Sequence, residues 1–389
     1  MINHIKSCAE VDHPLLLDKL WLFGLEESVI QWFHSYLSGR TQSVLIDGCL
    51  SPPLEIECGV PQGSILGPLL YIMFTNEIPD LAHNHAVSYQ HSQPCRSTCG
   101  STVCYVDDGT YSVGHADASI LSQKLSAQYS KIADYMAANN LVINADKTHL
   151  VVMGTKSTAA KRKDVSLVAG SHIISPSMTE KLLGGHISQD LKWKHHILVS
   201  EDSLVKQLTS RVNGLAMMSP RASLETRLMV ANGIKIWKLC YLIQLWGGCE
   251  TYLTKHLQVL QNRAARLVTG NGWFTLKRKL LKTCKWLSIN QLIVYQSIIA
   301  THKIVINNSP YHLATRMSTT HPRWTRQATT GCIRFGETFS ANQSLVKTSF
   351  CYRTVSQYNS IPASIRSIRS IATFKSKLKK WVEVNVPID

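Results

Sequence analysis

Residues 104–109 read Cys-Tyr-Val-Asp-Asp-Gly and place two adjacent carboxylates, Asp107 and Asp108, after a short apolar run. A second β-prone run, from Thr110 to Gly114, follows the glycine. Two such runs flanking Asp-Asp-Gly predict a β-hairpin with the acids at its tip. Adjacent acids repel, and their usual partner is a pair of divalent cations about 3.5–4 Å apart that promote phosphoryl transfer. From these six residues alone the alternative is an ordinary turn, because Asp-Gly is a strong turn dipeptide.

Three further stretches accompany the hairpin. Residues 59–70 read Gly-Val-Pro-Gln-Gly-Ser-Ile-Leu-Gly-Pro-Leu-Leu, residues 141–148 read Leu-Val-Ile-Asn-Ala-Asp-Lys-Thr, and residues 181–184 read Lys-Leu-Leu-Gly. Their order and spacing resemble the palm of a reverse transcriptase, and most closely that of non-LTR (LINE-type) retrotransposons. The resemblance covers residues 9–200 well and 205–290 more loosely. Its most specific part is Gly59–Pro68, which matches the family's template-gripping motif.

The resemblance implies a role for each motif. Asp107 and Asp108 would bind Mg²⁺, with two ions expected in the intact family site, and would act as catalytic residues. Tyr105 would lie near the primer end, and Lys147 would lie near the leaving pyrophosphate as a general acid. The template-binding residues would be Pro61, Gln62, Gly63 and Ser64. The structural alternatives are a simple Gly/Pro turn for the template-binding loop and a turn lysine for Lys147.

The start of the chain departs from the family pattern. Residues 10–14, Glu-Val-Asp-His-Pro, resemble the end of the family's first metal-binding motif. Anchoring on them assigns the catalytic Asp to Asn3, the sugar-screening Phe to Cys8 and the second Asp to Ala9. None of the three is the family's residue. We therefore expect an N-terminally truncated reverse transcriptase without fingers, inactive as it stands.

Charge is distributed unevenly. Residues 1–150 carry 7 Lys and Arg against 15 Asp and Glu, whereas residues 151–389 carry 34 against 10. An acidic half with a metal site followed by a strongly basic half indicates a nucleic-acid partner. A generally basic protein with no such partner is the alternative. The expected partners are an RNA template and a DNA primer.

Composition limits the protein classes. A chain of 389 residues predicts two or three domains. No apolar run approaches the ~20 residues that span a bilayer, and the N-terminus lacks a signal-peptide pattern. We expect no membrane partner and an intracellular protein of the nucleus or cytoplasm, not a secreted one. The 11 cysteines are then mostly reduced thiols.

Residues 82–101 show no periodicity but are rich in possible zinc ligands. The candidate ligands are His83, His85, His91, Cys95, Cys99 and Cys104. Their spacing is irregular and no second cysteine pair follows, so a polar insertion before the hairpin is the alternative to a zinc site.

Hydrophobic periodicity predicts both helices and strands, hence an α+β fold. The resemblance implies a palm of antiparallel strands backed by helices over residues 1–200 and a helical thumb-like region over 201–305, and the composition predicts a loose basic connection with a C-terminal helix over 306–389. The predicted helices are 14–23, 26–37, 67–76, 118–139, 224–246, 255–268, 277–285, 289–304 and 373–382. The predicted strands 42–46 and 54–58 flank Asp47-Gly48, which is a signal for a second hairpin. The other predicted strands are 141–144, 149–153 and 181–187.

The function implied by the resemblance is RNA-directed DNA polymerisation, which extends a DNA primer on an RNA template by two-metal phosphoryl transfer. One alternative is a catalytically dead nucleic-acid-binding remnant, because the first metal-binding motif is lost. Another is a basic helical scaffold that binds protein partners.

Overall fold

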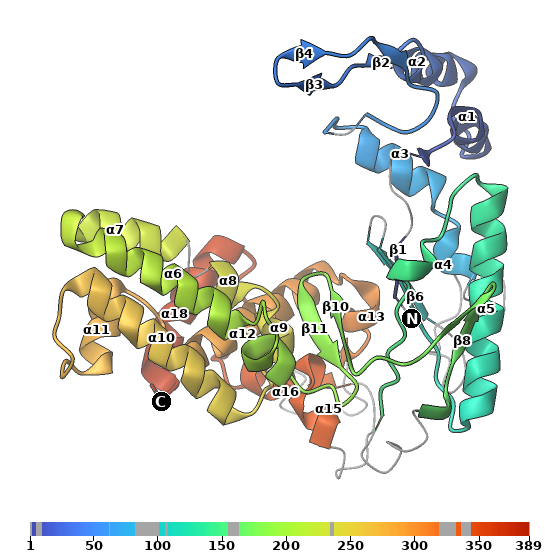
Figure 1. Cartoon of the computed structure of the whole chain (residues 1–389). Coiled ribbons are helices and arrows are strands. Elements are labelled where there is room, and N and C mark those ends of the chain that lie inside the picture. The colour runs from blue at the N-terminus through green and yellow to red at the C-terminus, as the bar shows by residue number, and fades with distance from the viewer. Residues whose placement is uncertain are drawn as a thin grey trace. The chain divides into compact units, whose positions relative to one another are not determined.

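The computed structural model describes residues 2–4, 10–61, 63–81, 101–105, 108–154, 163–233, 237–318, 332–335 and 344–388 (Figure 1). The chain forms two compact units: Met1–Leu182 with Ser188–Asp190, and Leu183–Ile187 with Leu191–Asp389. We call them unit 1 and unit 2. Helices and small antiparallel sheets occur together, so the predicted mixed fold is confirmed. Among the described residues, none of the helices is long and apolar enough to cross a lipid bilayer.

Unit 1 contains most of the strands. Its helices are α1 (His13–Leu22), α2 (Glu27–Leu37), α3 (Gly67–Phe74), α4 (Ile78–Leu81), α5 (Ala118–Ala138) and the 3₁₀ turn η2 (Ala145–Lys147). Its strands are β1 (Ile2–His4), β2 (Thr41–Gln42), β3 (Leu45–Ile46), β4 (Cys49–Leu50), β5 (Leu54–Glu55), β6 (Ser101–Tyr105), β7 (Asp108–Ser112), β8 (Leu167–Ala169), β9 (His172–Ile174) and β10 (Thr179–Leu182).

The long helix α5 organises the core of unit 1. Its buried residues recur at helical spacing, and Asp117 caps it by accepting a hydrogen bond from the backbone N–H of Ile120 at 3.0 Å. Strand β8 packs against α5, and the Ser122 and Ser126 hydroxyls accept backbone N–H groups beside it at 3.1 Å (Figure 1). Residues from α1, α3, β7 and α5 share one hydrophobic cluster. The helix predicted at 118–139 is therefore confirmed.

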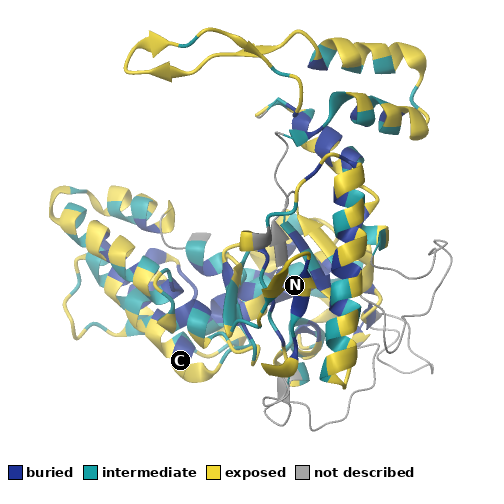
Figure 2. Ribbon diagram, turned by 45° about the vertical axis from the view of Figure 1, so that its right-hand side comes forward, coloured by how far each residue is buried: buried dark blue, intermediate teal, exposed yellow. Residues whose placement is uncertain are grey.

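A short arm follows α2 in unit 1. The two-residue turn Asp47-Gly48 joins β3 to β4, and both residues have positive φ, at 48° and 83°. Such a turn matches the right-handed twist of the paired strands, so the predicted hairpin forms. Strand β2 pairs with β5 in the same arm. All four strands of the arm are exposed (Figure 2).

Unit 2 is mostly helical. Its helices are α6 (Leu204–Met218), α7 (Leu224–Ala231), α8 (Trp237–Cys240), α9 (Ile243–Trp246), α10 (Thr251–Thr269), α11 (Lys277–Cys284), α12 (Ile289–Asn307), α13 (Tyr311–Ala314), α15 (Ser344–Thr348), α16 (Phe350–Asn359), α17 (Ala363–Arg366) and α18 (Ile371–Asn385), with the short helical turns η5 (His195–Val199) and η6 (Ser219–Arg221). Its strands are β11 (Gly185–Ser188), β12 (Met317–Ser318) and β13 (Arg334–Phe335).

Helix α12 lies at the centre of unit 2. Its buried residues occur all round it, and Ser288 with Gln291 forms a capping box at its start. The ring of His302 stacks on Phe374 of α18 at 3.5 Å between ring centroids and bonds to the Tyr358 hydroxyl at 3.0 Å. Helices α16 and α18 are held on α12 by such contacts together with apolar packing.

The predictions for four segments are wrong. The segments 141–144 and 149–153 form only isolated bridges, because the Asn144 side chain and carbonyl accept bonds from Lys147 and Thr148 and curl the chain. The segment 181–187 is not one strand, because Leu183 and Gly184 both have positive φ and separate β10 from β11. The single helix predicted at 224–246 is divided, and Leu242 adopts a left-handed conformation between α8 and α9.

Candidate active site

A three-stranded antiparallel sheet carries the candidate site, in the order β1-β7-β6. Tyr105 pairs with Asp108 at the end of the β6–β7 hairpin. The predicted hairpin is thus confirmed, but its turn is shifted: Asp108 is the first residue of β7, not part of the tip. Asp107 lies outside the described residues, as does Val106.

The side chains of β7 alternate between two faces. Gly109 and Tyr111 are buried, whereas Asp108 is half-buried on the opposite face. A Cβ on Gly109 would lie 3.0 Å from the Tyr111 hydroxyl, so a larger residue here would displace that ring by a few tenths of an ångström. Burial raises the pKa of Tyr111 well above its ordinary value, and nearby Tyr71 of α3 acts in the same direction. The neutral Tyr111 side chain therefore packs in the core on one face of β7, and Asp108 lies on the other, less buried face.

Strand β1 completes the sheet. Its register pairs Asn3 with Gly109 and His4 with Asp108. The position that the sequence motif assigns to the first catalytic aspartate is therefore in the strand next to Asp108, with an amide residue in place of an acid. The sequence patterns did not predict β1, because it is only three residues long, and the motif anchored on Val11 is the one signal that marks it.

Lys147 is in the 3₁₀ turn η2, and η2 packs against β1. Its side chain is exposed, and its backbone N–H donates to Asn144 Oδ1 at 3.2 Å. Both a turn lysine and a lysine near the substrate are compatible with this position. The turn that contains Lys147 therefore packs against the sheet whose neighbouring strands contain Asn3 and Asp108.

The Gly59–Pro68 loop is held by residues of the first motif. The Gly59 N–H donates to the Val11 carbonyl at 2.7 Å, and His13 Nε2 contacts the Gly59 carbonyl at 2.7 Å. Asp12 caps α1 through the Leu15 N–H at 2.9 Å and accepts the Asn140 side chain at 2.9 Å. Both carboxylate oxygens of Asp12 therefore accept hydrogen bonds that hold this part of the chain together.

The loop itself ends in a tight helix start. Gly63 has φ 82°, and the Ser64 hydroxyl accepts the Gly67 N–H at 2.9 Å. A Cβ on Gly67 would meet the Pro61 carbonyl at 2.9 Å. Pro61 and Ser64 are half-buried and Gly63 is exposed, whereas Gln62 lies outside the described residues. The hydroxyl of Ser64 therefore serves first as a cap.

The zinc hypothesis remains untested by the geometry. Residues 82–100, which contain five of its six candidate ligands, lie outside the described residues. In the part of the chain that the structure does describe, there is no group of three or more His, Cys, Asp or Glu that could hold a metal ion.

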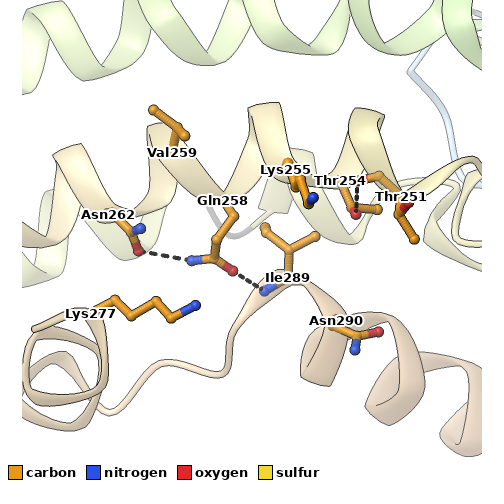
Figure 3. Close-up of a pocket in the computed structure, with 9 residues that line it drawn as sticks. All are labelled: Thr251, Thr254, Lys255, Gln258, Val259, Asn262, Lys277, Ile289 and Asn290. Atoms are coloured by element: carbon orange, nitrogen blue, oxygen red, sulfur yellow. Dashed lines mark hydrogen bonds between the residues drawn. The ribbon is translucent and has the colours of Figure 1, made fainter. Parts of the chain in front are cut away.

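Unit 2 contains a cavity of about 520 Å³. Figure 3 shows it between α10, Lys277 at the start of α11, and Ile289 and Asn290 at the start of α12. The Gln258 amide accepts the Ile289 N–H at 2.9 Å and donates to Asn262 at 2.9 Å. The sequence patterns gave no signal for this cavity, because its residues come from three helices and no motif links them.

Comparison with known proteins defines the class. Residues 6–187 match the family of reverse transcriptases (RNA-dependent DNA polymerases). This segment contains the β6–β7 hairpin and the Gly59–Pro68 loop, and it is a reverse transcriptase domain.

The relatives are polymerases of mobile elements. The chain is 29% identical over 269 residues to the RNA-directed DNA polymerase from the mobile element jockey of Drosophila funebris, covering 69% of this chain and 28% of that protein. It is 27% identical over 282 residues to the probable RNA-directed DNA polymerase from transposon X-element of Drosophila melanogaster, covering 69% of this chain and 29% of that protein. The chain thus spans less than a third of the length of these relatives. The resemblance to a non-LTR retrotransposon reverse transcriptase is confirmed.

Proposed function

We propose that unit 1 is the palm of an RNA-directed DNA polymerase and that the helices of unit 2 after residue 200 act as its thumb. The observation that carries this proposal is the sheet order β1-β7-β6, which pairs the Asn3 strand with the strand of Asp108. This is the arrangement that a carboxylate-based phosphoryl-transfer site requires, since ligands from separate stretches of sequence must converge.

The oxygen-donating side chains expected at the site match a hard cation such as Mg²⁺, except that one carboxylate is missing. Reverse transcriptases generally use divalent metal ions. Asp108, with its sequence neighbour Asp107, would offer the carboxylate oxygens that Mg²⁺ prefers. Asn3 offers a neutral amide at the remaining position, so the set holds one charge fewer than the motif requires. A bound divalent ion would stabilise negative charge on the transferred phosphoryl group.

The residues of the chain have their own tasks in this proposal. Pro61, Gln62 and Gly63 approach the template, with Gly63 exposed, while Tyr105, which is 62% exposed, lies beside the primer end. Lys147 supplies a positive charge, and a proton, near the pyrophosphate. RNA and DNA are the proposed partners of this chain, as the names of its relatives suggest.

The absent carboxylate makes the alternative function concrete. With Asn3 in the sheet, the chain binds primer–template but catalyses extension poorly or not at all. Filter binding of an RNA–DNA primer–template tests the predicted binding, and an extension assay on the same samples tests the predicted loss of catalysis. Binding without extension supports a reverse transcriptase domain with an impaired metal site. Absence of binding at low salt contradicts the proposal.

A further inference from the structure

Two aromatic side chains stand exposed on the loop between α10 and α11. Trp273 is 71% exposed and Phe274 is 97% exposed, although neither belongs to the reverse transcriptase segment 6–187. Exposing one large ring is common, but two consecutive rings on one short loop are a candidate interaction site. The residues of this loop, 270–276, are all described, and we call it the aromatic loop.

The aromatic loop is anchored at both ends. Gly270 has φ 68° and its N–H donates to the Arg266 carbonyl at 2.8 Å, which ends α10. Arg227 donates to the Leu267 carbonyl at 3.0 Å and so holds the last turn of α10. At the other end, the Leu276 carbonyl accepts the N–H groups of α11. The rings are thus displayed on a defined turn.

One ring is already oriented by a cation. The Arg266 guanidinium lies 4.8 Å from the centroid of the Trp273 ring. Such a contact stabilises one orientation of the indole. Because Trp273 remains mostly exposed, the contact leaves a large part of the ring available to a further flat partner.

The stretch of chain that contains the loop carries one sign of charge. Residues 251–318 contain 10 Lys and Arg and no Asp or Glu. Arg263 on α10 and Arg278, Lys279 and Lys282 on α11 are exposed. This charge complements a polyanion and opposes a basic partner.

We propose that the aromatic loop, with these cations, is a binding site for single-stranded nucleic acid, in which Trp273 and Phe274 stack on unpaired bases. Aromatic side chains set in a basic surface bind single strands in this way without sequence preference. The inference rests on the proposed function only in taking nucleic acid as the substrate class. It adds a second contact region, separate from the sheet that carries Asp108.

The cavity of Figure 3 adds polar groups directly after the loop. Lys277, which follows Leu276, lines it together with Lys255. A strand stacked on the loop would find two ammonium groups here for its next phosphates.

An anionic membrane is the competing partner for a basic surface with exposed rings. Binding at a bilayer interface uses a continuous apolar face on an amphipathic helix. The apolar residues of α11, Leu280, Leu281 and Cys284, are buried in the core of unit 2. Only the loop residues could insert into a bilayer. A nucleic-acid strand stacked on the rings therefore fits this surface better than a lipid membrane does.

The test uses the full chain in EDTA, so that no metal-dependent step contributes. Affinity for oligo(dT), oligo(rU) and a blunt duplex is measured by fluorescence anisotropy for the native protein and the W273A/F274A variant. We expect affinity for both single strands to fall at least about tenfold, as the loss of stacked bases requires. Affinity for the duplex should change less, and the salt dependence of binding should stay the same, because phosphate contacts are kept.

Two controls separate stacking from folding. W273F retains a ring and should retain most of the affinity. Y311A removes a comparably exposed ring, 67% exposed, from α13 and should leave affinity unchanged. Because Trp273 and Phe274 are exposed, the double variant should melt at the native temperature.

Each other outcome overturns the inference. Equal affinity of the native and W273A/F274A proteins for single strands would show that the loop does not stack on bases. An equal loss of affinity for the duplex and for the single strands in W273A/F274A would contradict the assignment of the loop to single strands. Loss of binding to phosphatidylserine vesicles with no loss for oligonucleotides would identify a membrane site. If the native protein binds none of the nucleic acids, the proposed function itself fails.

Discussion

The two units differ in how their charges are placed. In unit 1, Asp108 lies in a sheet whose neighbouring strand carries the uncharged Asn3. In unit 2, residues 251–318 carry cations only. A grip on phosphates depends on summed charge and tolerates the loss of single residues, whereas a metal site depends on each ligand. Binding should therefore persist in this chain while chemistry fails.

The largest expected effect is on catalysis. The native chain should give no measurable primer extension with Mg²⁺ or Mn²⁺, since loss of one charged ligand costs several kcal/mol, or about a thousandfold in rate. The N3D/C8F/A9D variant restores the motif and should gain activity if catalysis depends on it. A radioactive primer-extension assay measures both. Robust extension by the native chain that depends on Asp107 would show that the motif is misaligned.

The second effect concerns the stability of unit 2. Trp246 is fully buried, and its indole N–H donates to the Tyr241 carbonyl at 2.9 Å. W246A should destabilise unit 2 by about 3–5 kcal/mol, because it removes a large core side chain. Urea unfolding measures the loss of stability, and amide hydrogen exchange shows which helices lose protection. Equal loss of protection in α5 of unit 1 would contradict two separately stabilised units.

The third effect is a pH dependence confined to unit 2. Burial lowers the pKa of His196 to about 4; His186 and Lys238 act in the same direction, while Asp202 opposes them. The folded state therefore favours neutral His196, so its contribution is complete above about pH 6.5 and is lost as pH falls toward 4. Stability should fall by up to about 1.4 kcal/mol per pH unit in that window.

His196→Leu supplies the control for this effect. It removes the titrating group, so the stability of unit 2 should lose this part of its pH dependence. Urea midpoints measured at about pH 7 and about pH 5 compare the two proteins. An unchanged difference between the two pH values would exclude His196 as its source.

The smallest effect is on nucleic-acid binding. R263E with K279E should lower the slope of log affinity against log salt by about two, because the proposal assigns one phosphate contact to each position. The matched K124E/K131E variant reverses two charges on α5 of unit 1 and should change the slope little. Equal effects of the two variants would show that the basic helices have no special part in binding.

Local patterns predicted much of this fold. The spacing of Leu125, Tyr129, Ile132 and Met136 fixes α5, and Asp47-Gly48 fixes a hairpin. The division of 224–246 was missed, because the segment is rich in apolar residues and the left-handed turn at Leu242 has no glycine to mark it. The pairing of Asn3 with Gly109 joins residues over a hundred positions apart, which no local pattern contains.

The most direct test is a Mn²⁺ titration followed by electron paramagnetic resonance, which counts free ions and needs no catalysis. Asn3→Asp restores the carboxylate that the first motif requires, and affinity for Mn²⁺ should rise at least about tenfold, since even changes behind a ligand alter metal affinity by 10–100-fold. In an Asp107→Asn/Asp108→Asn background the same substitution should raise the affinity much less. An unchanged affinity in Asn3→Asp, or an equal gain without the two aspartates, would contradict a metal site shared by the first motif and the Asp-Asp hairpin.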